Sequence, residues 1–207
     1  ILGGQSFKTE GTVPREWSYL DGTYIKSVHK KFGTKKIKTY PNATLTQIFN
    51  DTFIRGIRQV PLLNYIDYRK KTAKTLLAKE YGWQDYPGHH YENIYSRFAF
   101  GWYLPRKFRI DKRIISLSGP IRSGHITRDE ALEEISHKPD VDQKLVEYCI
   151  HKLGLTTEEF NRILALPNRN YQNYFTSESI LKHFKGPIRL AVKMNIFTPV
   201  LYEKYFA

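Results

Sequence analysis

A short polar segment at residues 82–92 carries the densest mixture of side chains that could do chemistry. It contains the adjacent histidines His89 and His90, with Gly88 before them and Glu92 after them. Imidazole and carboxylate groups are the usual proton donors and acceptors in enzymes. The segment is therefore a candidate loop over a ligand. The alternative is a solvated loop in which a side chain such as His90 caps the helix that follows.

A strongly basic segment follows at residues 104–113. Five of its ten side chains are lysine or arginine. If this segment lines a cleft, its charges would neutralise phosphate oxygens through charge-assisted hydrogen bonds. Asp111 could orient one of these cations. The alternative is a basic connector that faces water.

Two further sets of residues follow predicted strands in the first half of the chain. The strands are expected near residues 1–7 and 59–63. Open α/β sheets bind ligands outside the carboxyl ends of their strands, and glycine lets the backbone approach a ligand closely. Residues at these strand ends are therefore candidates for binding a substrate or nucleotide: Gly4, Thr9, Glu10, Gly11, Asn64 and Tyr65.

The sequence shows no clear metal site and no clear set of residues for nucleophilic catalysis. His89 and His90 are adjacent and point apart, and no clear third metal ligand is close in sequence. Serine, histidine and acidic residues do not occur at a recognisable hydrolase spacing. Cys149 is the only cysteine, which excludes an internal disulfide framework. It lies in an apolar helical stripe, so we expect it in the core, and a reducing cytoplasm is the natural compartment.

Composition indicates a folded protein with an anionic partner. Hydrophobic residues make up 41% and charged residues 26% of the 207 residues, as in ordinary globular proteins. The net charge of +13 favours nucleotides, sugar acids, nucleic acid or an acidic membrane face. No apolar run approaches the roughly 20 residues of a membrane helix.

Apolar spacing and capping patterns predict the elements. In the first half we expect a helix from about Pro14 to Phe32, a strand at 36–40, a helix after Thr44, and a helix over 72–81 that stops near Gly82. The second half is predicted to be helical. Its helices are expected at 92–104, where Pro105 would end the helix, at 127–135, 141–153 and 156–164, and on both sides of Gly186-Pro187.

Alternation of strands and helices in the first half predicts an α/β fold with a parallel sheet. The strands are too few to complete a sheet, and the chain opens inside a predicted strand without an initiator methionine. We therefore expect a chain that begins in mid-fold, without its N-terminal strands. The expected organisation is an α/β part over residues 1–104 and a helical domain over residues 105–207.

Taken together, these segments resemble the N-acetyl sugar amidotransferases of bacterial surface-polysaccharide synthesis. Gly4, Thr9-Glu10-Gly11 and Val60 to Tyr65 fit this family. The main resemblance rests on three motifs: Gly82-Trp83 with Gly88-His89-His90-Tyr91-Glu92, Leu104-Pro105-Arg106-Lys107-Phe108 with Asp111-Lys112-Arg113, and Ser123-Gly124 with Thr127-Arg128-Asp129-Glu130-Ala131-Leu132. The similarity covers nearly the whole chain, and only the later half or more of a full family member.

The resemblance implies an adenine-nucleotide α-hydrolase fold, similar to a Rossmann fold, with ATP pyrophosphatase chemistry. The amide oxygen of a nucleotide-linked sugar acid would attack the α-phosphate of ATP, with Mg²⁺ assisting, and ammonia would then displace AMP to leave an acetamidino group. Ammonia is expected from a glutaminase subunit through a barrel-type subunit. The setting would be lipopolysaccharide or O-antigen synthesis in the cytoplasm.

The resemblance also gives roles to the candidate residues. Cations of the basic segment would neutralise phosphate or the sugar carboxylate: Lys107, Lys112 and Arg113. Asp111 would orient them. His90 and Glu92 would contact the sugar or handle protons, and Glu10 and Asn64 would lie near the nucleotide or substrate.

Three features depart from the family pattern. The family's Ser-Gly-Gly-x-Asp-Ser phosphate loop does not occur in these 207 residues, and neither does its N-terminal cysteine motif. His89 stands where a lysine is expected. Because the loop would hold pyrophosphate, we expect no turnover by this chain alone. The alternatives are a fragment that needs the missing N-terminal segment, a split gene product that needs a partner chain, and a remnant.

Two other function classes remain open. A basic nucleic-acid-binding module would bind with steep salt dependence, but the basic residues are dispersed and no recognisable binding signature occurs, so no nucleic acid is expected. A helical subunit-docking module could use the aromatic tail at residues 197–206.

Overall fold

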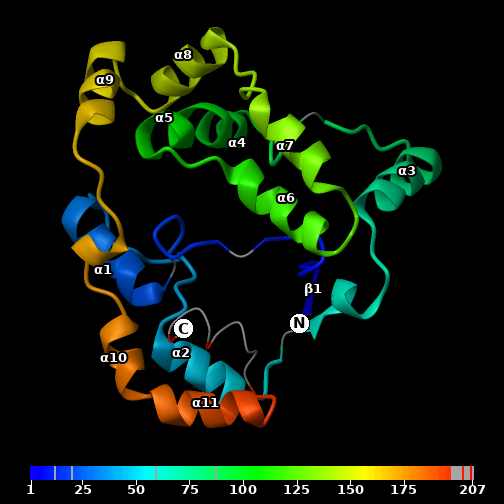
Figure 1. Cartoon of the computed structure of the whole chain (residues 1–207). Coiled ribbons are helices and arrows are strands. Elements are labelled where there is room, and N and C mark those ends of the chain that lie inside the picture. The colour runs from blue at the N-terminus through cyan, green and yellow to red at the C-terminus, as the bar shows by residue number, and fades with distance from the viewer. Residues whose placement is uncertain are drawn as a thin grey trace. The chain divides into compact units, whose positions relative to one another are not determined.

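The computed structural model describes residues 1–11, 13–19, 21–58, 60–86 and 88–196, together with Tyr202 and Phe206. The chain forms two compact units (Figure 1). Unit 1 contains Ile1–Val13 and Gln59–Asn168, and unit 2 contains Pro14–Arg58 and Arg169–Ala207. The predicted division at residue 105 differs from this one, because residue 105 lies within unit 1 in a continuous helical stretch.

Unit 1 contains a two-stranded parallel sheet. Strand β1 (Leu2–Gly3) pairs with β2 (Val60–Pro61), with Leu2 opposite Val60. A 3₁₀ turn, η2 (Leu62–Tyr65), follows β2 directly. Parallel pairing agrees with an α/β fold, but two short strands do not define a Rossmann-like sheet, so that fold class stays a prediction.

The helix predicted at 92–104 continues past Pro105, and the expected stop there is wrong. It comprises α4 (Ile94–Phe98), the π-helical turn η3 (Ala99–Tyr103) and α5 (Leu104–Phe108). Proline clashes with the carbonyl four residues earlier in a regular helix, and the wider π turn accommodates it. The helix ends instead at Arg109, whose φ is 57° and whose N–H donates to the carbonyls of Leu104 and Pro105.

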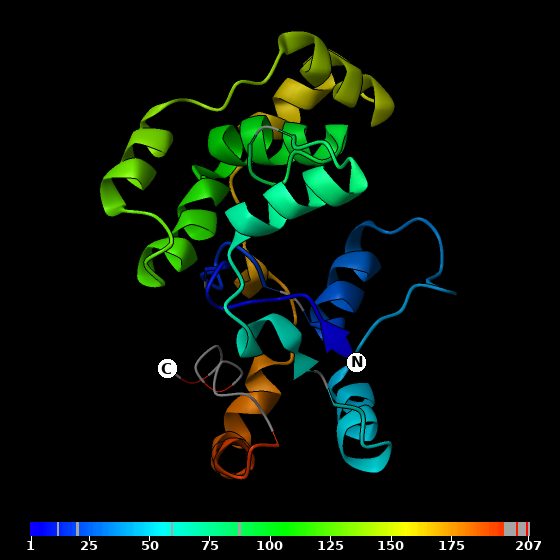
Figure 2. The ribbon, with the colours of Figure 1, turned by 90° about the vertical axis from the view of Figure 1, so that its right-hand side faces the viewer.

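The helices predicted at 72–81, 127–135, 141–153 and 156–164 are present, and the helix at residues 112–122 was not predicted. Helix α3 (Lys70–Tyr81) ends at Gly82, whose φ is 64°. Helix α6 (Lys112–Arg122) is followed by α7 (Arg128–Ser136), which lies beside it in Figures 1 and 2. Capping boxes start α7 and α9 (Thr157–Ala165), and α8 (Gln143–Lys152) lies between them in sequence.

The core of unit 1 is aromatic and aliphatic. Phe98, Val146, Cys149, Ile150 and Phe160 form a buried cluster, against which Trp102 and Tyr103 pack. The prediction that Cys149 lies in the core is therefore confirmed. The cluster anchors α4, η3, α8 and α9 to one another by burial of apolar surface.

Unit 2 is helical in its described part (Figure 2). Its helices are α1 (Gly22–Phe32), α2 (Leu45–Phe49) with the π-helical η1 (Asn50–Ile54), the 3₁₀ turn η4 (Tyr171–Asn173), α10 (Glu178–His183) and α11 (Lys185–Lys193). Helix α1 starts later than predicted from Pro14, because Asp21 caps it by accepting the Tyr24 N–H at 2.8 Å.

Two further predictions for unit 2 are wrong. Residues 36–40 form bends and irregular structure instead of a strand. Gly186-Pro187 lies in the first turn of α11, where proline is tolerated, so the break between α10 and α11 comes at Phe184. The aromatic tail at residues 197–206 lies mostly outside the described residues. No helix that the described residues form is long and apolar enough to cross a membrane.

Candidate functional site

A cleft with a volume of about 970 Å³ opens in unit 1. Its walls are the segment after β1, the first two turns of α3, the segment between α3 and α4, and helices α6 and α7. This volume is at the upper end of those that bind small molecules. The cleft brings together many of the predicted site residues: Gly4, Thr9, Glu10, Gly11, Gly88, His89, His90 and Lys112.

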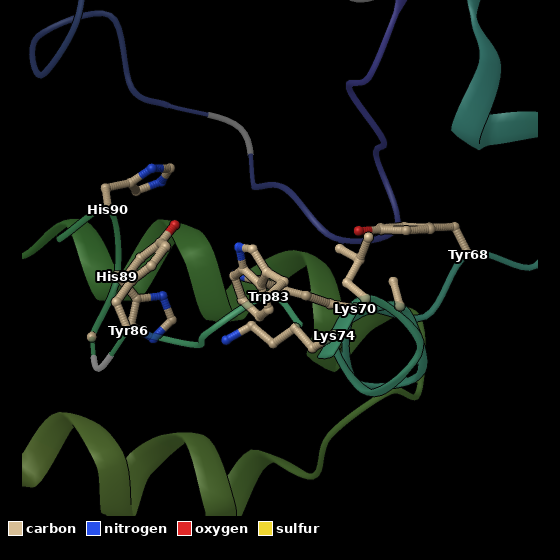
Figure 3. Close-up of a pocket in the computed structure, with 10 residues that line it drawn as sticks. Tyr68, Lys70, Lys74, Trp83, Tyr86, His89 and His90 are labelled. Atoms are coloured by element: carbon tan, nitrogen blue, oxygen red, sulfur yellow. The ribbon is translucent and has the colours of Figure 1, made fainter. Parts of the chain in front are cut away.

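A smaller pocket of about 210 Å³ shares part of this lining (Figure 3). Figure 3 shows Lys70 and Lys74 on α3 together with Trp83, His89 and His90 from the segment that follows α3. Tyr68 and Tyr86 add aromatic surface to the same pocket. The polar segment predicted as a loop over a ligand thus lies against the start of α3.

The lining of the cleft is cationic. Its lysines and arginines outnumber its carboxylates: Arg69, Lys70, Lys71, Lys74 and Lys112 against Glu10, Asp85 and Glu134. Asp85 is engaged by Lys74 at 2.7 Å, and Glu134 lies 2.6 Å from Nε2 of His89. Within the described ranges, no ion pair engages the other three lysines of the lining. Their charges are therefore available to an anionic ligand.

The start of α3 breaks the usual rule for charges on a helix. Its N-cap, Arg69, makes no side-chain capping bond, and its first turn has no acidic residue but contains Lys70 and Lys71. Cations are unfavourable near the positive end of the helix dipole, and the first backbone N–H groups lack helical partners. A bound anion would relieve both costs.

Glu10 is held at the wall of the cleft by a close approach of two backbones. A Cβ atom on Gly119 of α6 would lie only 2.5 Å from the Glu10 carbonyl oxygen, and one on Gly11 would overlap the Ile115 carbonyl oxygen. The N–H of Glu10 also donates to the Ser6 carbonyl at 2.9 Å. The two glycines therefore let this segment lie directly on α6.

His90 adopts a left-handed backbone conformation, with φ of 61°. Its ring packs edge-on against Phe100, with 5.9 Å between ring centroids. Partial burial lowers the pKa of His90, and the charges of Lys112 and Lys70 act in the same direction against the opposing effect of Glu92. The imidazole is therefore neutral near pH 7 and can accept as well as donate a hydrogen bond.

Lys107, predicted to neutralise phosphate, points away from the cleft. Its Nζ donates to the carbonyls of Ile163 at 3.2 Å and Leu164 at 2.8 Å, and also to that of Leu166. These carbonyls lie at the C-terminal end of α9, which a cation stabilises. Lys107 is a helix cap in this structure.

Replacement of Lys107 by methionine is expected to lower the free energy of unfolding by roughly 1–2 kcal/mol, because the carbonyls at the end of α9 lose a charged donor. Urea denaturation followed by circular dichroism measures this loss. Ligand affinity should stay unchanged. A large loss of ligand affinity in a folded variant would instead show that Lys107 belongs to the binding site.

Asp111 and Arg113 form a pair that is directed at α7. Asp111 caps α6 by accepting the Arg113 N–H at 2.9 Å, and its carboxylate accepts from Nε and Nη2 of the same arginine. Arg113 also donates to the carbonyls of Glu134, Ile135 and His137 at the end of α7. Asp111 does orient a cation, but toward a helix end instead of a phosphate.

Three other predicted residues lie outside the lining of the cleft. Glu92 is exposed and precedes Asn93, which caps α4. The side-chain oxygen of Asn64 accepts the N–H of Phe7 at 3.1 Å and so ties the segments after β1 and β2 together. Tyr65 is 75% exposed.

Several residues of the cleft are absent from the sequence-based candidates. They include Lys70, Lys71, Lys74, His125 and Glu134. A signal for the first three exists, because a basic cluster at the predicted start of a helix, after a strand, is where an anion site is expected. Glu134 and His125 are brought to the cleft by α6 and α7, and no local pattern marks them.

Residues 92–187 match the family model of the C-terminal domain of WbpG-like LPS biosynthesis proteins. The match includes the Lys112, His125 and Glu134 side of the cleft. No curated protein and no solved structure matches the chain. Over this range the chain is similar to a family of lipopolysaccharide biosynthesis proteins, which supports the coarser part of the predicted function.

Proposed function

We propose that this chain is part of an ATP-dependent amidotransferase of lipopolysaccharide or related glycan biosynthesis. The reaction converts the acetamido group of a nucleotide-linked sugar acid into an acetamidino group through an adenylated intermediate. The cleft of unit 1 is the proposed site of the nucleotide-linked sugar acid. The observation that carries this proposal is that one cleft brings together Lys70, Lys71 and Lys112 with residues of the motifs that resemble those of sugar amidotransferases.

The charges of the cleft suit such a substrate. Lys70 and Lys71 offer positive charge for the phosphates at the start of α3. Glu10, which lines the cleft, can accept hydrogen bonds from sugar or ribose hydroxyls. His89 is held 2.6 Å from the Glu134 carboxylate, an arrangement that orients an imidazole for proton transfer.

The described residues do not offer a site for Mg²⁺ by themselves. No three His, Cys, Asp or Glu side chains of the described part come together as a metal-binding group. Two of the three carboxylates of the cleft are engaged by Lys74 and His89. We therefore assign the sugar substrate, and not the metal, to this cleft. Ammonia supplied by a glutaminase through a barrel-type subunit is part of the same proposal.

Isothermal titration with UDP-N-acetylglucosaminuronic acid tests the proposal. The unchanged chain should bind, and the double variant Lys70→Gln/Lys71→Gln should bind at least roughly 30-fold more weakly, because each hydrogen bond to a charged group contributes about 1.5–3 kcal/mol. Lys79→Gln is the matched control, since Lys79 lies on the same helix outside the cleft. Its affinity should equal that of the unchanged chain.

Absence of binding by the unchanged chain, or equal binding by the double variant, would contradict the proposal. Tighter binding to duplex DNA or RNA, with steep loss of affinity as salt rises, would favour the nucleic-acid-binding alternative.

A further inference from the structure

The available cations of the cleft fall into two groups on different helices. Lys70 and Lys71 stand together in the first turn of α3. Lys112 stands at the first position of α6, and it is the sole cation of that helix in the lining of the cleft as described. Its neighbour Arg113 is engaged by Asp111 and by the end of α7. The two groups therefore offer unequal charge.

The group on α3 suits a ligand part with several negative charges. Two adjacent lysines lie there next to Arg69, which pairs with Asp67 at 3.3 Å. The N-cap of this helix makes no side-chain capping bond to the backbone N–H groups of the first turn. A diphosphate presents at least two charges and many acceptor oxygens, which such a cluster of donors can satisfy.

The group on α6 suits a single negative charge. The Lys112 ammonium lies 5.1 Å from the centroid of the Phe100 ring, which limits its position. The neighbouring His90 is neutral near pH 7 and offers a polar contact without adding charge. Ser116, one turn further along α6, adds a hydroxyl to the same lining. One available cation with polar neighbours can bind a single carboxylate.

We propose that Lys70 and Lys71 bind the diphosphate of the nucleotide-linked sugar, and that Lys112 binds the carboxylate of the sugar. Lys112 is then a specificity-determining residue, which selects sugar acids over neutral nucleotide sugars. This inference rests on the proposed function. It adds that α3 binds the diphosphate and that α6 binds the carboxylate of the same ligand.

The test compares two probes that differ in this one group, UDP-N-acetylglucosaminuronic acid and UDP-N-acetylglucosamine. The unchanged chain should bind the acid roughly tenfold more tightly, as expected for one charged contact. Lys112→Gln should lose that tenfold preference by weakening the acid alone. Lys70→Gln should weaken both probes by a similar factor and keep the preference. Lys112→Arg should retain it in part, because the charge is kept.

Circular dichroism establishes that each variant is folded before titration. The inference is overturned if Lys112→Gln weakens both probes equally or neither, or if the unchanged chain does not distinguish them while binding both. Failure of the unchanged chain to bind either probe would instead overturn the proposed function itself. The two failures are therefore distinguishable.

Discussion

Replacing Arg113 with methionine is expected to lower the free energy of unfolding by roughly 3 kcal/mol or more. The guanidinium side chain is only 12% exposed and joins the Asp111 carboxylate to three carbonyls at the end of α7. Removing it leaves a half-buried carboxylate and several acceptors without a donor, which is far costlier than loss of a surface ion pair. Urea denaturation provides the measurement.

Arg122→Met is the matched control, because Arg122 lies on the same helix and is exposed, and its side chain bonds the Ser118 carbonyl at 3.3 Å within that helix. This control should change the free energy of unfolding by no more than about 0.5 kcal/mol. Equal stability of the Arg113 and Arg122 variants would show that the bridge between α6 and α7 does not stabilise unit 1.

The pair of Asp111 and Arg113 also predicts that part of the free energy of unfolding is lost in acid. Burial acts to raise the pKa of Asp111, but hydrogen bonds from the side chain and backbone of Arg113 outweigh it and lower that pKa. A group whose pKa is lowered on folding stabilises the fold above its unfolded value, about 4, and loses this contribution as pH falls through the folded value. The free energy of unfolding of the unchanged chain should fall as the pH drops below about 4. In Arg113→Met this part of the pH dependence should be absent.

Substitution of Gly119 by alanine is expected to destabilise the chain by about 1–3 kcal/mol, because the new methyl group would lie 2.5 Å from the Glu10 carbonyl oxygen. A loss of stability would be informative, because alanine in place of glycine ordinarily stabilises a helix by about 1 kcal/mol. Displacement of Glu10 from α6 should also weaken binding of the nucleotide sugar. Denaturation and titration of the same sample measure both effects.

The control for Gly119 is Gly186→Ala. Gly186 lies in helix α11, and no atom of another described part of the chain lies within 4 Å of the place that its Cβ would take. This variant should be as stable as the unchanged chain or slightly more stable. If Gly119→Ala behaves in the same way, the close contact between Glu10 and α6 does not form in solution.

Local signals in the sequence predict much of the helical structure. Thr127 with Glu130 and Thr156 with Glu159 form capping boxes at the starts of α7 and α9, and Gly82 ends α3. Each of these signals acts within one or two turns, so a single sequence contains it. Pro105 misleads for a physical reason. Whether a proline ends a helix depends on the hydrogen bonding of the preceding turn, which here is a π turn.

The site could be predicted only in part. The polar segment at residues 82–92 and the segment after β1 do meet in one cleft. Sequence cannot tell which cations are already engaged by distant partners. Lys107 looks as available as Lys112 in the sequence, yet its ammonium binds carbonyls more than fifty residues away. Lys70 lies in a basic cluster at the predicted start of a helix, but only the tertiary structure shows that it lines the same cleft as Lys112.

A crystal structure with UDP-N-acetylglucosaminuronic acid is the measurement that tests the central claim most directly. Our account predicts that the diphosphate lies at the first turn of α3, within hydrogen-bond distance of Lys70 or Lys71, and that the sugar points toward α6. Density for the ligand outside this cleft, or an empty cleft at saturating ligand, would contradict it.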